Sequence, residues 1–509
     1  MHATTPLPDD QAVLKALVTA QQAEIARLNF IIAKLRRMQF GRRSEQLDGT
    51  LAQLELALEG IEAARREAAA DVSPDAISGA ASSPKRPARK PLPDHLPRET
   101  VEHAPAEGSC PDCGSVFVKL GEDVSEMLEY VPAHFKVIRH VRPKFACSRC
   151  ERIVQAAAPS RPIERGLPGP ALLAHVLVGK FCDHLPLYRQ SAIYARSGIE
   201  LDRSTLADWV GQSAQLLAPL VEALRRYVLA ADKVHADDTP LPVLAPGDGR
   251  TKTARLWTYV RDERPAGSGD PPAVWFAYSP NRKGEHPQRH LRTFTGILQA
   301  DAYAGFNAIY ETGQVQEAAC WAHLRRKFFD VHRAQASPIA AEALTRIGQL
   351  YAIEAGVRGE PPSIRRAVRQ AQAHPLLKDL RTWLEVQSRR VSRKSGISEA
   401  IQYGLNHWQA LIRYAEDGRI EIDNNAAERA LRAVALGRKN FLFGGSDAGG
   451  ERAAAMYSLI GTAKLNGLDP EAYLRDVLGR IGEHPINQVE ALLPWNLNQD
   501  QSQSLRKAA

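Results

Sequence analysis

The hydrophobic pattern changes from helical spacing to a period of two after Val228, and this change constrains the fold more than any other feature of the chain. Three alternating or apolar runs follow, bounded by Gly and Pro: KVHADDTPLPVLA, ARLWTYVRDE and PAVWFAYSP. Such runs are typical of an antiparallel β-meander. A helical pattern at residues 285–294 and a short run, GILQAD, come next. The sequence therefore predicts three strands, a helix and a fourth strand, in that order.

This order of elements predicts an α/β core of the ribonuclease-H-like type. Asp237 then lies midway along the first strand and Asp301 at the end of the fourth. Because these strands are neighbours in such a core, the two carboxylates can face one another across a divalent cation. Carboxylate oxygens select Mg²⁺ or Mn²⁺ rather than zinc. A pair of such ions can activate the attacking oxygen of phosphodiester cleavage and stabilise the leaving one.

A third carboxylate is expected on a later helix. In the segment RIEIDNNAAERALR, the residues Asp423, Asn424 and Asn425 predict a helix start, and Glu428 lies about one turn inside. Each acid alone also has a structural interpretation, as a turn residue, a strand-end cap or a helix-surface charge. The basic residues that follow suit DNA phosphates, namely Arg429, Arg432, Arg438 and Lys439.

Two C-x-x-C motifs flank a segment of strand-forming residues near positions 131–141. Each motif makes two thiolates converge, and four thiolates complete the tetrahedral shell of a structural zinc. The alternative, four unrelated buried cysteines, is disfavoured by the pairing. The predicted zinc ligands are Cys110, Cys113, Cys147 and Cys150.

The helical region at 165–229 has the pattern of a helix-turn-helix. One helix closes on Gly198, and a second begins with Ser204 and Thr205 after a short turn. The second helix would enter the DNA major groove with Arg203 and Ser204 near its leading end. A helical hairpin without a DNA role shows the same pattern and stays an alternative.

The N-terminal segment predicts a helix with heptad spacing. Its apolar seam is interrupted by Gln21 and comprises Leu14, Val18, Ile25, Leu28, Ile32 and Leu35. A self-packed hairpin and a coiled coil between chains both satisfy this pattern. Residues 68–98, rich in Ala, Ser, Pro and Lys, predict a flexible linker.

Charge favours a polyanionic partner. Lys and Arg number 66 against 58 Asp and Glu, a net charge of +8. No apolar run approaches the ~20 residues of a membrane span, and the N-terminus lacks the features of a signal peptide. The sequence therefore predicts a cytoplasmic, nucleoid-associated protein, in which the six cysteines favour metal binding over disulfides.

Over nearly its whole length the chain resembles transposases of the insertion sequence sixty-six family. The resemblance is carried, in one order, by LRRMQFGRRSEQL, the paired C-x-x-C motifs, VHADDTP, ADAYAGFN, CWAHLRRKFF, IDNNAAERALR, GRKNFLFGGSDAGG and TAKLNGLDPEAYLRDVL. It implies a DDE-type triad, Asp237, Asp301 and Glu428, that performs metal-dependent DNA strand cleavage and strand transfer. Where the family usually shows Asp-Glu-Thr this chain has Asp237-Asp238-Thr239, which leaves the role of Asp238 open.

The resemblance also implies partners. These are the terminal inverted repeats of the element and the target DNA, with self-association through the heptads expected and accessory proteins of the same element left open. Cys320 and His323 form a C-x-x-H motif that, by the resemblance, several DDE groups share. As zinc ligands they lack an evident partner pair, so a place in the core or a role in supporting the active site, without binding the catalytic metal, is favoured instead. The predicted DNA contacts are Arg203, Ser204, Arg325, Arg326, Lys327, Arg438 and Lys439.

The predicted organisation is a multidomain α/β chain whose ribonuclease-H-like core is split by an all-α insertion. Its parts are a helical zipper (10–67), a linker (68–98), a zinc-binding domain (99–160), a helix-turn-helix region (165–229), the core (230–440, with the insertion at about 334–396), a C-terminal helical region (441–490) and a tail (491–509). Two other functions fit parts of this pattern. An inactive DNA-binding regulator is disfavoured by the presence of all three acids, and a structure-selective nuclease by the zipper and the helix-turn-helix.

The zinc site generates the first prediction. Protein purified under mild conditions should retain one structural zinc per chain, and Cys147→Ser should lower the melting temperature because it removes a ligand from a closed shell. Metal analysis and thermal unfolding measure both effects. A chain without zinc, or a variant that melts like the parent, would contradict the zinc ribbon.

Overall fold

The computed structural model describes residues 92–497, apart from 93, 95, 104–116, 132–133, 151, 165, 246–249 and 442. The chain divides into two units, residues 1–89 and 90–509, and the described residues belong to the second. The predicted zipper at 10–67, most of the predicted linker, Cys110, Cys113 and the end of the tail lie outside the described residues. No helix in the described part is long and apolar enough to cross a membrane.

A four-stranded sheet opens the second unit. It contains β1 (Arg98–Glu102), β2 (Phe117–Val131), β3 (His134–Cys147) and β4 (Ile153–Gln155). The strand β3 pairs in parallel with β1 and antiparallel with both β2 and β4. The long β2–β3 pair places Phe117 opposite Cys147.

Four helices come next, α3 (Pro170–Phe181), α4 (Leu187–Arg196), α5 (Arg203–Leu216) and α6 (Ala218–Leu229). Gly198 has φ +75°, and the N–H of Ile199 bonds to the carbonyl of Tyr194. Glycine tolerates this left-handed conformation, so it ends α4 where the sequence predicted an end. The helices α4 and α5 pack against each other, as in a helix-turn-helix.

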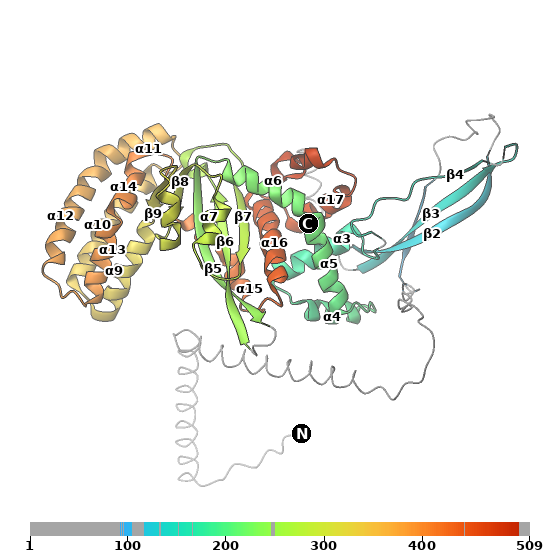
Figure 1. The fold of residues 1–509 in the computed structure, drawn as a ribbon, viewed down its shortest axis with the longest axis horizontal. Helices are drawn as coiled ribbons and strands as arrows, with labels where there is room; N and C mark the ends of the chain where they lie inside the picture. Colours follow the sequence, from blue (N-terminus) through green and yellow to red (C-terminus); the bar gives the residue numbers. More distant parts are fainter. Residues whose placement is uncertain are drawn as a thin grey trace, which may run out of the picture. The chain divides into compact units, whose positions relative to one another are not determined.

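The central sheet has five strands in the order β7-β6-β5-β8-β9 (Figure 1). In chain order these are β5 (Lys233–Ala245), β6 (Arg250–Arg261), β7 (Ala273–Ser279), β8 (Gly296–Ala300) and β9 (Val315–Ala319). The first three form an antiparallel meander, and β8 and β9 run parallel to β5. The helix α7 (Glu285–His290) precedes β8, so the predicted order of three strands, helix and strand is confirmed.

Helices from the end of the chain pack on this sheet. The helix α15 (Asn425–Gly437) contacts β5 and β6, and α16 (Asp447–Leu465) contacts β7. Two buried hydroxyls of α16 accept hydrogen bonds from the edge strand β7: Ser458 from the N–H of Phe276 (2.8 Å) and Thr462 from the N–H of Val274 (3.1 Å). The helix therefore satisfies backbone groups that an edge strand otherwise leaves unpaired.

A second hydrophobic core lies among the helices between β9 and α15. They are α9 (Trp321–Gln335), α10 (Pro338–Gly356), α11 (Pro362–Val368), the short π-helix η3 (Arg369–Ala373), α12 (His374–Ser388), α13 (Gly396–Asn406) and α14 (Trp408–Glu416). The all-helical stretch thus continues beyond residue 396, where the sequence had placed the end of the insertion.

The remaining elements are short or C-terminal. They are η1 (Arg264–Ala266), η2 (Ala304–Phe306), α8 (Asn307–Tyr310), α17 (Pro470–Arg480), η4 (Ile486–Leu492) and η5 (Pro494–Asn496). The main hydrophobic core runs from the four-stranded sheet through α3–α6 to the central sheet and α15–α17.

Two buried arginines form ion pairs in this region: Arg369 within the helical stretch, and Arg365 between that stretch and the segment before α15. Arg369 is fully buried and forms two hydrogen bonds with Glu354, at 2.7 and 2.6 Å. Arg365, 1% exposed, bonds to Glu421 at 2.7 Å. Buried charges are tolerated because each has a partner.

Glu354→Ala should therefore lower the free energy of unfolding by about 3–5 kcal/mol, because it leaves buried guanidinium charge unpaired. Glu342 on the same helix pairs with Arg346 at the surface, so Glu342→Ala should cost no more than about 0.5 kcal/mol. Chemical denaturation compares the two variants. Equal losses would show that the buried pair does not hold the helices.

Candidate active site

Pairing of β5 with β8 brings Asp237 and Asp301 to the same end of two neighbouring strands. The parallel register matches Lys233 with Ile297 and His235 with Gln299. Continued by two residues, this register sets Asp237 opposite Asp301, which directly follows β8. The two aspartates are thus adjacent in the sheet although 64 positions separate them in the chain.

The pKa of Asp237 reflects the charges of the acids near it. Its pKa is raised to about 7, first by burial and then by the charge of Asp301, with smaller contributions from Asp238 and Glu428. The N–H of Asp238 donates to Asp237 Oδ1 at 2.7 Å and partly offsets the shift. Asp237 therefore lies within electrostatic reach of Asp301, Asp238 and Glu428.

The backbone next to Asp301 has an unusual conformation. Ala302 has φ +60°, a region that non-glycine residues seldom occupy. The turn directs the N–H of Tyr303 to Asp301 Oδ1 at 3.2 Å, and the Tyr403 hydroxyl donates to the Asp301 carbonyl at 3.2 Å. Strained residues of this kind cluster at functional sites. The turn and α13 hold Asp301 in position.

Glu428 lies in the first turn of α15 and faces α9. Its Oε1 is 3.8 Å from His323 Nδ1, and its Oε2 is 3.7 Å from the exposed guanidinium of Arg326. The ligand atoms of Glu428, His323 and Cys320 all lie within 4.8 Å of one another. The C-x-x-H motif therefore lies against the third acid, as the prediction of a supporting role requires.

Asn424 connects the segments that carry these acids. It is fully buried, its Oδ1 is 3.1 Å from His235 Nδ1, and its Nδ2 donates to the carbonyl of Ala236 at 2.8 Å. Burial lowers the pKa of His235 to about 3, so the ring is neutral and can donate from Nδ1. The N–H of Asn424 donates to Cys320 Sγ at 3.1 Å. One side chain and one amide thus join β5, the start of α9 and the start of α15.

Asp238 faces away from Asp237, as successive residues of a strand do. Its side chain is 2% exposed and pairs with Arg255 at 3.0 Å and Arg282 at 2.8 Å. Arg282 also approaches Asp301 to 3.9 Å and stacks on the Tyr303 ring at 4.1 Å. Asp238 is a buried counter-ion for two arginines, one of which also approaches Asp301.

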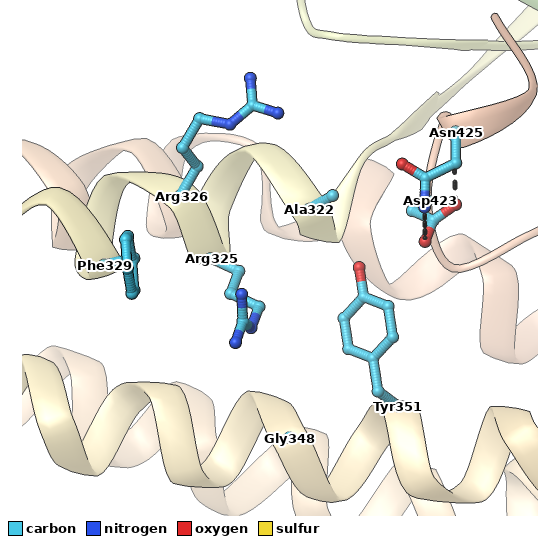
Figure 2. A pocket seen from close by; sticks show the side chains of 8 residues that line it. All are labelled: Ala322, Arg325, Arg326, Phe329, Gly348, Tyr351, Asp423 and Asn425. Atoms are coloured by element: carbon cyan, nitrogen blue, oxygen red, sulfur yellow. Dashed lines mark hydrogen bonds between the residues drawn. The ribbon is translucent and has the colours of Figure 1, made fainter. Parts of the chain in front are cut away.

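A cavity of about 530 Å³ opens between α9, α10 and the start of α15. Figure 2 shows Arg325 and Tyr351 projecting into this space from facing helices, with Asp423 bonded to Asn425 at its end. Arg325, Arg326 and Lys327 are exposed along α9. The helix thus presents a cationic surface next to the acids.

The other predicted contacts lie apart in the fold. Arg203 and Ser204 are exposed at the start of α5. Lys439 is exposed after α15, whereas Arg438 is half-buried and donates to the carbonyl of Pro240 at 2.8 Å. Arg438 therefore has a structural bond in addition to any contact with DNA.

Two of the four predicted zinc ligands, Cys147 and Cys150, lie in the described residues. Cys147 ends β3 and is buried, and Cys150 lies in the turn before β4. The N–H of Cys147 bonds to the carbonyl of Arg152 at 2.8 Å, which closes the turn. Phe117, the first residue of β2, pairs with Cys147 next to this turn.

Sequence reasoning missed Arg282 and Arg255, whose partner is set by strand pairing alone. The sequence pattern identified Asn424 only as part of a helix start. Two consecutive asparagines at the start of a helix are a usable signal for a buried amide. No sequence motif predicted the hydrogen bond from the Tyr403 hydroxyl to the carbonyl of Asp301.

Comparison with known proteins identifies the family. Residues 165–452 match the transposase IS66 family, residues 107–151 the zinc-finger binding domain of transposase IS66, and residues 458–495 the IS66 C-terminal element. Residues 27–101 match a family described as transposase C of IS166 homeodomain. The chain belongs to the IS66 family of transposases.

Relatives of similar length occur in Sinorhizobium fredii (strain NBRC 101917 / NGR234). Uncharacterized protein y4hP is 44% identical over 507 residues, covering 95% of this chain and 91% of its own length. Uncharacterized proteins y4qI and y4jD are 41% and 39% identical and cover 96% and 97% of this chain and 92% and 98% of their own lengths.

The raised pKa of Asp237 predicts how stability depends on pH in magnesium-free protein. The folded pKa, about 7, exceeds the unfolded value of 3.8, so this group's contribution is fully present below pH 3.8 and is lost as pH rises through 7. Asp237→Asn, a neutral mimic, should melt like the parent near pH 4 and a few degrees higher near pH 8. If the difference in melting temperature between Asp237→Asn and the parent does not change with pH, the raised pKa of Asp237 is contradicted.

Proposed function

We propose that this chain is an active DDE-type transposase whose central sheet is a ribonuclease-H-like core and whose catalytic acids are Asp237, Asp301 and Glu428. The observation that carries the proposal is the strand register that sets Asp237 of β5 opposite Asp301 at the end of β8, and the pKa of Asp237, raised first by burial and then by the charge of Asp301, agrees with it. Mutually repelling acids are costly unless cations bind between them. The strand order and the match to the transposase family support the same assignment.

The oxygen ligands fit Mg²⁺ or Mn²⁺, which would be held by the three acids. Such ions supply activation of the attacking oxygen and stabilisation of the leaving oxygen. The chain's own residues position these ligands: the strands fix the two aspartates, and Asn424 fixes the start of α15. His323 and Cys320 support the position of Glu428.

The reaction has two steps in this proposal. Water attacks the phosphodiester at the element end, the bond from phosphorus to the 3′ oxygen breaks, and that oxygen is protonated. The resulting 3′-hydroxyl attacks a target phosphodiester in line, and the target's 3′ oxygen leaves. No covalent enzyme intermediate forms.

DNA binding is assigned to two surfaces. The exposed basic residues Arg325, Arg326 and Lys327 of α9 lie beside the acids and suit backbone phosphates. The helix α5 begins with exposed Arg203 and Ser204 and suits recognition of the terminal inverted repeats. Zinc in the four-cysteine site would be structural, and self-association through residues 10–67 would bring two ends together.

Alanine replacement of any one acid should lower Mg²⁺-dependent cleavage of DNA carrying the terminal repeats by about three orders of magnitude or more, and a double variant should lose little beyond that. The effects are non-additive because each acid serves the same site. DNA binding, measured by a mobility shift, should survive because neutralising an acid reduces repulsion.

Asp423→Ala provides the matched comparison. Asp423 accepts a hydrogen bond from the N–H of Asn425 at the start of the helix that carries Glu428, so its loss should cost about 1 kcal/mol of stability and leave cleavage largely intact. If Asp423→Ala abolishes cleavage and Glu428→Ala does not, the third acid is misassigned. Normal cleavage by all variants would refute the proposal that these acids carry out the reaction.

A further inference from the structure

We propose that Cys320, His323 and Glu428 form a zinc-binding site separate from the four-cysteine site, and that zinc bound there inhibits DNA cleavage by withdrawing Glu428 from the catalytic acids. Binding at this site stands on its own geometry. The inhibition rests on the proposed function, because it requires Glu428 to be a catalytic ligand.

The three side chains converge from two helices. Cys320 is the residue before α9, His323 lies in its first turn, and Glu428 lies in the first turn of α15. Their ligand atoms lie within 4.8 Å of one another, with His323 Nδ1 and Glu428 Oε1 at 3.8 Å. Tetrahedral zinc holds its ligands about 3.3–3.8 Å apart, as its bond lengths require. Small side-chain rotations therefore complete the site.

Two of the ligand atoms lack other partners. His323 Nδ1 and Glu428 Oε1 are buried and form no hydrogen bond among the described residues. Orphaned polar atoms of this kind are costly and usually indicate a function or an absent ligand. A cation between them would satisfy both, and Arg326, 60% exposed, can move away from Glu428.

Cys320 has surroundings that suit a metal thiolate. Its sulfur is buried and accepts the N–H of Asn424 at 3.1 Å, and the N–H groups of Ala322 and His323 also favour the charged form. Burial nevertheless raises the pKa of the thiol to about 12, so binding at neutral pH must release the thiol proton to solvent.

The set of donors distinguishes this site from the magnesium site. Sulfur and imidazole nitrogen are ligands for zinc, whereas magnesium prefers oxygen alone. Three protein ligands leave a fourth position open to water, and the partial exposure of His323 and Glu428 gives an ion access. Zinc at this site would hold the carboxylate that the catalytic cluster needs.

The test uses the full-length protein, with zinc chloride as the probe. After incubation with excess zinc and gel filtration, the parent should carry two zinc ions per chain and Cys320→Ser one. Cys182→Ser, which removes a half-buried thiol at the end of α3, should still carry two. Cobalt substitution should give thiolate-to-metal absorption that is stronger in the parent than in Cys320→Ser.

Cleavage is then measured at fixed magnesium with increasing zinc, each variant relative to its own zinc-free rate. The zinc concentration that halves cleavage should rise at least about tenfold in Cys320→Ser, since a lost ligand weakens binding by that order or more. His323→Gln should show the same increase in the zinc concentration that halves cleavage. This variant replaces Cys320→Ser in the test if Cys320→Ser fails to fold.

One zinc ion in the parent, or two in both Cys320→Ser and His323→Gln, would overturn the site. If the parent binds two ions and zinc does not affect cleavage, the claim that zinc withdraws Glu428 from the catalytic acids is wrong. Equal inhibition of parent and variants would contradict that claim as well, because the inhibitory ion would then lie on the aspartates. If the parent shows no cleavage at all, the proposed function fails, and the metal count still decides the site.

Discussion

The buried amide of Asn424 is the contact on which the arrangement of the acids depends. It bonds to His235 and Ala236 of β5, and its N–H reaches the sulfur of Cys320. These three contacts hold the start of α15 against β5 and against the start of α9. Glu428, one turn along α15, has its position fixed as a consequence. A hydrogen-bonded amide serves here better than an apolar side chain, because its bonds have direction as well as strength.

Charge is distributed unequally around β5. On one side Asp238 is neutralised by Arg255 and Arg282, whereas Asp237 on the other side faces carboxylates. Adjacent positions of β5 therefore carry an acid held in two ion pairs and an acid with a raised pKa, and Arg282 links the first of them to Asp301. The energy lost by repulsion at Asp237 must be supplied by the rest of the fold, including the large apolar core and the buried pair of Arg369 with Glu354. Local instability at the acids and rigid packing around them are complementary properties of one site.

Much of the fold could be predicted because its signals are local. Alternation predicts strands β5–β7, Gly198 predicts the end of α4, and both are confirmed. The family resemblance is confirmed as well. The catalytic roles and the DNA contacts remain predictions, and the zipper, Cys110 and Cys113 lie outside the described residues. The partners of Asp238 and Asn424 could not be predicted, because they are set by strand register and helix docking between residues far apart in the chain. The helical stretch beyond residue 396 was missed because nothing in its local pattern distinguishes insertion from core.

The position of the helical stretch has a consequence for how the protein is made. Asp237 and Asp301 leave the ribosome well before Glu428, since helices α9 to α14 are synthesised between them. A nascent chain can therefore pair β5 with β8 and fold α5 while the last acid is still being translated. Premature termination within this stretch would produce a chain that retains α5, Asp237 and Asp301 and lacks Glu428. The order of the segments along the chain thus leaves the cluster of acids incomplete until α15 has been synthesised.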